Sequence, residues 1–141
     1  MPLARILVID DNDADVCLLR ETLDQKENDY ELEILRDGEE ALRFVRDYPI
    51  GVREPEPCVI VLDLNLPRHD GVAILHAIRE TPALEHIQII VLSGLASPHQ
   101  KAEIADLGAL YRTKPSTLEQ LAELAAEIMA VCKNSSPALT R

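Results

Sequence analysis

The sequence is poor in positive charge, in cysteine and in long apolar runs. Its 141 residues include 14 Lys and Arg against 25 Asp and Glu, which gives a net charge of -11. An acidic surface repels phosphate backbones and anionic lipids, so nucleic acid and membranes are unfavourable direct partners. No apolar run approaches the ~18 residues that a membrane span needs, and the N-terminal apolar stretch carries no cleavage pattern. We therefore expect a cytoplasmic protein.

Cysteine occurs only at Cys17, Cys58 and Cys132. The number is odd, the spacing is wide and each cysteine has apolar neighbours. These features favour buried thiols over disulfides or a zinc site. We expect all three side chains to serve in packing rather than in redox or metal chemistry.

Short apolar runs alternate with amphipathic stretches along the chain. The strand-like runs are 4–9, 31–35, 58–62, 87–92 and 109–113, and the helix-like stretches are 13–24, 38–47, 71–80, 98–106 and 117–132. Parallel strands need crossover connections, which are nearly always right-handed. The pattern predicts an α/β fold of the flavodoxin-like, doubly wound type, (βα)5, with a five-stranded parallel sheet and helices on both faces. A chain with 47% hydrophobic residues and this length suits one core.

Two helix starts carry capping signals. Asp13 is expected to cap the first helix, because a short acidic side chain accepts hydrogen bonds from free backbone N–H groups. Ser116 and Glu119 have the spacing of a capping box at the start of the last helix.

Two segments lack regular periodicity. Residues 48–57 are rich in proline and charge and are expected to form a surface loop before the central strand. We expect one domain over residues 1–133 and a flexible C-terminal tail over 134–141.

Three carboxylates follow apolar runs directly. Asp10 and Asp11 close the first run and Asp63 closes the central one. Ligands of open α/β sheets bind at the carboxyl ends of the strands, where these side chains would meet. Because crowded carboxylates repel one another unless a cation is shared, the pattern predicts a hard divalent ion, with Mg²⁺ as the default and Asn65 offering a carbonyl oxygen. Asp63 could then act as a nucleophile toward a phosphoryl group.

Two further polar residues close the fourth and fifth apolar runs. Lys114 is placed to neutralise phosphoryl oxygens, and Ser93 would offer a hydroxyl at the same edge. A serine in this position is often only a turn residue, so Ser93 gains weight only together with Lys114 and Asp63. The bond between Lys114 and Pro115 is open to either the cis or the trans form.

Four motifs resemble those of the receiver domains of two-component response regulators. They are IDDND at 9–13, LDLNLPRHDG at 62–71, LSG at 92–94 and YRTKP at 111–115. The resemblance covers residues 4–132 in order, spacing and strand-end context. It implies a phosphoprotein of phosphorelay signal transduction rather than an enzyme with turnover of its own.

Carried over by position, the resemblance assigns a role to each polar residue. Asp63 would be the phosphoacceptor, and Asp10 and Asp11 the pair that holds Mg²⁺ with Asp63 and the backbone carbonyl of Asn65. The remaining roles fall on Lys114 as the phosphate-pairing cation, Ser93 as the switch hydroxyl and Tyr111 as the aromatic switch. A half-buried strand-end tyrosine with no switching role explains Tyr111 equally well.

The resemblance also implies partners. The chain looks like the stand-alone regulators paired with bacterial phytochrome-type histidine kinases, so the phosphoryl donor would be such a kinase or a phosphotransfer protein. Receivers of this kind often pair through the face of the fourth helix, fifth strand and fifth helix, so the resemblance allows a homodimer through that face, while the sequence itself leaves the oligomeric state open. Nucleic acid and membranes are not expected to bind.

Three other functions share part of this pattern. A phosphatase of the haloacid-dehalogenase type also uses a strand-end aspartate with Mg²⁺, but its second acid falls where this chain has Asn65. A carrier of flavin mononucleotide needs a phosphate loop rich in Gly or Ser after the first strand, where this chain has acidic residues. A receiver-like module that is never phosphorylated would not need the full set of polar strand-end residues.

Overall fold

The computed structural model describes residues 3–26, 29–48 and 56–134. The strands are β1 (Ala4–Ile9), β2 (Tyr30–Leu35), β3 (Val59–Asp63), β4 (Gln88–Ser93) and β5 (Leu110–Thr113). The helices are α1 (Asp13–Asp24), α2 (Gly38–Arg46), α3 (Gly71–Arg79), α4 (Pro98–Asp106) and α5 (Leu118–Asn134). The ten elements fall where the sequence predicts them, with ends that differ by at most two residues.

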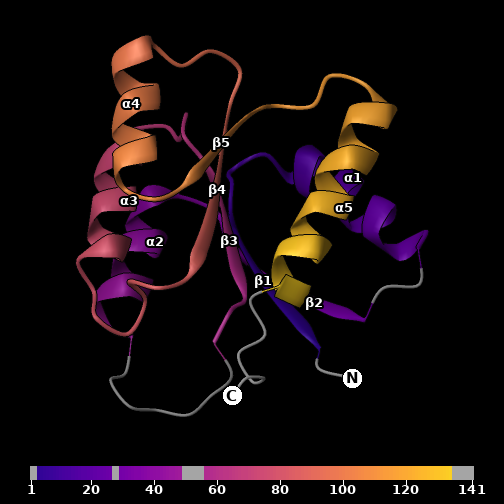
Figure 1. The fold of residues 1–141 in the computed structure, drawn as a ribbon, viewed down its shortest axis with the longest axis horizontal. Helices are drawn as coiled ribbons and strands as arrows, with labels where there is room; N and C mark the ends of the chain where they lie inside the picture. The colour runs from indigo at the N-terminus through magenta and orange to yellow at the C-terminus, as the bar shows by residue number, and fades with distance from the viewer. Residues whose placement is uncertain (1–2, 27–28, 49–55, 135–141) are drawn as a thin grey trace.

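The strands form a single parallel sheet in the order β2-β1-β3-β4-β5. Helices α1 and α5 cover one face and α2, α3 and α4 cover the other (Figure 1). This is the doubly wound arrangement that the alternation predicts. Each face has its own apolar cluster, and every residue of β3 is buried between them. The sheet order places the end of β3 beside the ends of β1 and β4.

Arg79, the last residue of α3, connects the segments around α4. Its guanidinium donates hydrogen bonds to the carbonyls of Glu85 and Ile87 before β4 and to those of Leu107 and Gly108 after α4, at 2.6–3.1 Å. Gly108 has φ of 73°, a conformation that costs glycine little. Burial lowers the pKa of Arg79, but five fixed donors make guanidinium the side chain suited to satisfying several carbonyls at once.

The two helix caps differ from the predictions. Asn12 caps α1, with Oδ1 accepting from the N–H groups of Ala14 and Asp15 at 2.9 and 3.1 Å. Asp13 is the first helical residue and pairs instead with Arg36. The prediction failed because Asn and Asp cap about equally well and stand side by side here.

At α5 the capping pair lies one residue later than predicted. Thr117 Oγ1 accepts from the Gln120 N–H at 3.0 Å, and Gln120 Oε1 accepts from the Ser116 N–H at 2.7 Å. The sequence offers two overlapping boxes, Ser116 with Glu119 and Thr117 with Gln120, and the helix begins after the second hydroxyl.

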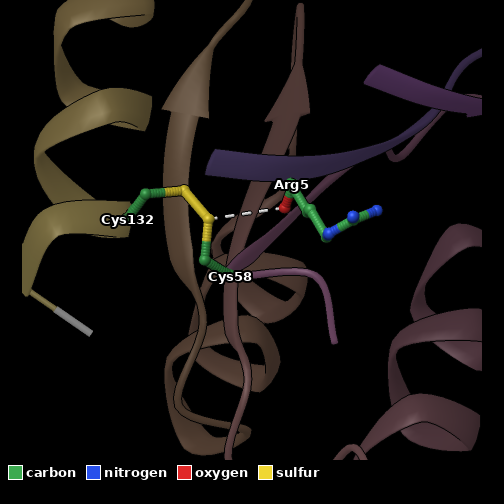
Figure 2. The surroundings of a disulfide bond; sticks show 3 residues. All are labelled: Arg5, Cys58 and Cys132. Carbon is green, nitrogen blue, oxygen red and sulfur yellow. Dashed lines mark hydrogen bonds between the residues drawn. A yellow bond between two sulfur atoms is a disulfide. The ribbon is translucent and has the colours of Figure 1, made fainter. Parts of the chain in front are cut away.

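The prediction of three buried thiols was wrong, although Cys58 and Cys132 do pack in the apolar cluster under α1 and α5. Cys58, just before β3, and Cys132, in the last turns of α5, are joined in a disulfide with Cα atoms 5.1 Å apart (Figure 2). Cys17 is a free thiol and is exposed, not buried. The two bonded residues are 74 positions apart, so only the fold brings them together.

The remaining expectations concern backbone and chain ends. The described residues contain no cis peptide bond, so Lys114–Pro115 is trans. None of the described helices is both long and apolar enough to cross a membrane. The predicted loop at 48–57 falls largely outside the described residues, as does nearly all of the predicted tail at 134–141. Both therefore stay predictions.

Candidate functional site

Asp63 ends the central strand and is only 2% exposed. Strand β3 carries it between β1 and β4, opposite Leu92 in register. Its Oδ1 accepts a hydrogen bond from the N–H of Asn65 at 2.9 Å. A buried carboxylate needs such partners, because desolvation disfavours its charge.

The three predicted aspartates meet at this edge. Carboxylate oxygens of Asp10, Asp11 and Asp63 lie within 4.8 Å of one another, with Asp10 and Asp63 buried and Asp11 exposed. The donor set is entirely oxygen, which suits a hard divalent cation and not a soft one. The residues present therefore fit the divalent metal that the sequence predicts.

Lys114 reaches the same carboxylate from the end of β5. Its Nζ lies 3.1 Å from Oδ2 of Asp63. Burial opposes the charge of Lys114, but the hydrogen bond to Asp63 and the negative charges of Asp63 and Asp10 outweigh it and raise the pKa of the ammonium group. A fixed positive charge thus lies beside the innermost carboxylate.

Asp10 has the opposite electrostatic environment. Burial raises the pKa of its carboxyl to about 6, against the lowering effect of a hydrogen bond from the Asn12 N–H, and the charge of Asp63 raises it further. Without a cation, ionised Asp10 is therefore costly to the folded state.

Because of this cost, we expect Asp10→Asn to raise the free energy of unfolding at neutral pH. The folded state holds the Asp10 proton more tightly than the unfolded state, so the free energy of unfolding falls as pH rises from about 4 to 6 and stays lowered above that. The metal-free variant should be more stable than the wild type at pH 7, by up to about 3 kcal/mol, with no difference below pH 4. Urea unfolding in the presence of a chelator measures this, and a less stable variant at pH 7 would contradict it.

Ser93 and Tyr111 lie together next to the acidic group. Ser93 is fully buried, and its Oγ accepts from the Leu95 N–H at 3.1 Å and lies 3.4 Å from the amide nitrogen of Asn65. The Tyr111 hydroxyl donates to the Ser93 carbonyl at 3.4 Å. The half-buried Tyr111 ring has Lys101 Nζ 5.2 Å from its centroid.

Two features of the site were not predicted. Asn65 was expected to contribute its backbone carbonyl, but its side chain contacts Ser93 on the neighbouring strand. A cavity of about 310 Å³ opens beside Asp10 and Lys114, between α1 and α5, and its walls include Leu19 and Leu121. The contact and the cavity cannot be predicted from the spacing of residues along the sequence, because each depends on which helices and strands pack side by side.

Comparison with known proteins decides the family. The family model for the response regulator receiver domain, which describes the family's sequences, matches residues 6–126. The chain belongs to this family. Receivers signal through phosphorylation, are phosphorylated by histidine kinases and bind a divalent metal at their acidic pocket. The predicted family and fold are thereby confirmed.

Individual relatives agree with this result. The receiver is 41% identical over 88 residues to response regulator Rcp1 of Synechocystis sp., covering 62% of this chain and 60% of that protein. The crystal structure of the phosphorylated cyanobacterial phytochrome response regulator RcpA has a TM-score of 0.82 at 30% identity, covering 99% of this chain and 100% of that one. The Mn²⁺-bound form of Rcp1 has a TM-score of 0.76 at 34% identity over 90% of this chain and 92% of that one. The receiver spans 24–60% of the length of the first curated relatives that it matches.

Proposed function

We propose that the receiver accepts a phosphoryl group on Asp63 from the phosphohistidine of a histidine kinase, with Mg²⁺, in the cytoplasm. The observation that carries the proposal is the environment of Asp63. One carboxylate is buried at a strand end, with an ammonium group 3.1 Å from one oxygen and two more carboxylates within 4.8 Å. A nucleophile, a cation for the phosphoryl oxygens and a set of metal ligands are thus within reach of one another.

The transfer uses groups already in place. A carboxylate oxygen of Asp63 forms a bond to phosphorus while the bond from phosphorus to the kinase histidine nitrogen breaks, and that nitrogen keeps the electron pair. Lys114 then pairs with a phosphoryl oxygen. Asp10, Asp11, Asp63 and the carbonyl of Asn65 would hold Mg²⁺, which supplies charge neutralisation for the transferred group when bound.

The switch belongs to the same proposal. A phosphoryl group on Asp63 offers new acceptor oxygens, and Ser93, which ends the neighbouring strand β4, carries a hydroxyl that can donate to one of them. If Ser93 turns toward it, the bonds from Leu95 and Asn65 to Ser93 Oγ are lost. Tyr111 is coupled to the same residue through the Ser93 carbonyl. The loop after β4 would then change shape.

The protein would not act as an enzyme on free phosphate esters. A phosphatase of the haloacid-dehalogenase type needs an acid two positions after its nucleophile to protonate the leaving group. The residue there is Asn65, and an amide cannot perform that step. We propose that phosphorylation and dephosphorylation of Asp63 are the only chemistry of the site.

Output would pass through protein contact. Leu95, in the loop before α4, is 88% exposed, and Leu110, on the edge strand β5, is 37% exposed. We propose that two copies pair through the face of α4, β5 and α5, to which these two segments belong. A net charge of -11 disfavours nucleic acid as the target. The phytochrome link of RcpA makes a phytochrome-type kinase the first candidate donor.

Phosphotransfer from candidate kinases tests the proposal. Each kinase is first autophosphorylated with radiolabelled ATP and freed of nucleotide, and the receiver is then added with Mg²⁺. We expect one kinase, of the phytochrome type, to lose its label to the receiver within minutes, and a chelator to block the transfer. If no kinase loses label and acetyl phosphate also fails to label the receiver, the proposed function is wrong.

A further inference from the structure

We propose that Cys58 and Cys132 form a reversible redox site, separate from the phosphoacceptor site, whose oxidation fastens the end of α5 to the start of β3. The two residues lie near the first residue of β3, at the end of that strand opposite to Asp63. Strand β3 runs from Val59 to Asp63, and five residues of strand span about 16 Å. The inference does not depend on the proposed function.

Geometry makes the pair competent for a disulfide. The Cα atoms are 5.1 Å apart, within the range of about 4.4–6.8 Å that disulfides require. Cys132 belongs to the apolar cluster under α1 and α5, and Cys58 packs against that cluster. The backbone therefore holds the two side chains at an ordinary separation for a disulfide.

The reduced state is also provided for. The sulfur of Cys58 lies 3.4 Å from the carbonyl oxygen of Arg5, which already accepts the Cys58 N–H at 2.8 Å (Figure 2). A disulfide sulfur has no proton to donate, whereas a thiol does. The Arg5 carbonyl therefore gives the thiol of reduced Cys58 a hydrogen-bond acceptor. The Cys58 sulfur thus has a bonding partner in both states, Cys132 when oxidised and the Arg5 carbonyl when reduced.

Access to the bond comes from the helix end. Cys132 is 8% exposed and lies two residues before the last residue of α5. Helix ends open locally at a small cost in free energy. Opening of the final turn would expose the sulfur atoms to a small thiol or disulfide without unfolding the sheet.

The reaction is thiol–disulfide exchange with a low-molecular-weight disulfide. The thiolate of one cysteine attacks a sulfur of the reagent and forms a mixed disulfide with that half of the reagent. The other half leaves as a thiolate. The second cysteine thiolate then attacks the protein sulfur of that mixed disulfide and releases the second reagent thiol. Two protein thiols are oxidised by two electrons and one reagent disulfide is reduced. A dithiol reverses both steps.

The test compares the full chain after oxidised glutathione and after dithiothreitol. Alkylation and peptide mass mapping should leave Cys58 and Cys132 unalkylated in the oxidised protein, where Cys17 is alkylated or carries glutathione, and should alkylate all three cysteines in the reduced protein. Because the bond closes a loop of 74 residues in sequence, reduction should lower Tm by about 5–15 °C. Hydrogen exchange at the last turn of α5 should rise on reduction, while labelling of Asp63 by acetyl phosphate stays the same.

Three variants give the controls. Cys58→Ser keeps a donor for the Arg5 carbonyl and Cys132→Ala keeps an apolar side chain, so both should fold and both should lose the Tm difference between oxidised and reduced samples. Cys17→Ser should keep it. Alkylation of Cys58 and Cys132 after oxidation, or a Tm difference that survives in Cys58→Ser, would overturn the proposal.

Discussion

Asp63→Asn should abolish labelling of the receiver by acetyl phosphate and Mg²⁺, while the wild type acquires an acid-stable, alkali-labile acyl phosphate. The amide of Asn is the same size as the carboxylate but is a far weaker nucleophile toward phosphorus. The label on the wild type should map to the peptide that contains Asp63. Mass spectrometry after short incubations measures both results.

The matched control separates loss of the nucleophile from loss of a metal ligand. Asp11→Ala keeps Asp63 but removes one ligand, so a high Mg²⁺ concentration should restore part of its labelling. The same concentration should restore none in Asp63→Asn. A label of unchanged size in Asp63→Asn would show that another residue is the acceptor.

Asp11→Ala should also lose most of the stabilisation that Mg²⁺ gives to the wild type. A ligand that binds only the folded state at 100 times its Kd adds about 2.7 kcal/mol to the free energy of unfolding. Asp11 is exposed, so the alanine variant should fold normally without metal. Thermal unfolding across a Mg²⁺ titration measures the loss as a smaller rise in Tm.

Asp13→Ala is the control for this variant. It removes the same charge two residues away, from a side chain that pairs with Arg36 and stands apart from the three clustered carboxylates. Its Mg²⁺ response should match that of the wild type. Equal Tm rises in Asp11→Ala and the wild type would argue against a metal site at this edge.

The sequence predicts the sheet and the site together, for one physical reason. Parallel strands buried on both faces need unbroken apolar runs, and polar residues can only follow where such a run ends. Asp10, Asp63 and Ser93 stand at those ends, so locating the strands also locates the site. The close approach of Lys114 to Asp63 follows from the same rule.

Other features depend on packing that one sequence does not reveal. Asn12 and Asp13 have nearly equal capping strength, so the choice between them rests on how the chain leaves β1. The contact of Asn65 with Ser93 requires that β3 and β4 be neighbours in register.

The cysteines illustrate the same limit more strongly. Odd number and wide spacing argued against a disulfide, yet β3 begins beside the last turns of α5 and brings Cys58 to Cys132. Only the order of the strands and the side on which α5 packs determine that meeting. Counting residues along the chain could not have found it.

The hydrogen bonds of Arg79 limit how this receiver can be re-engineered. A chimera that borrowed α4 and the following turn from another receiver would have to present carbonyls where Leu107 and Gly108 now present theirs. Without them the partly buried guanidinium would keep only its bonds to the carbonyls of Glu85 and Ile87 and would lose its other two acceptors at the seam of the graft. The exchangeable module therefore runs from α3 to the start of β5, and a designer should move that segment whole.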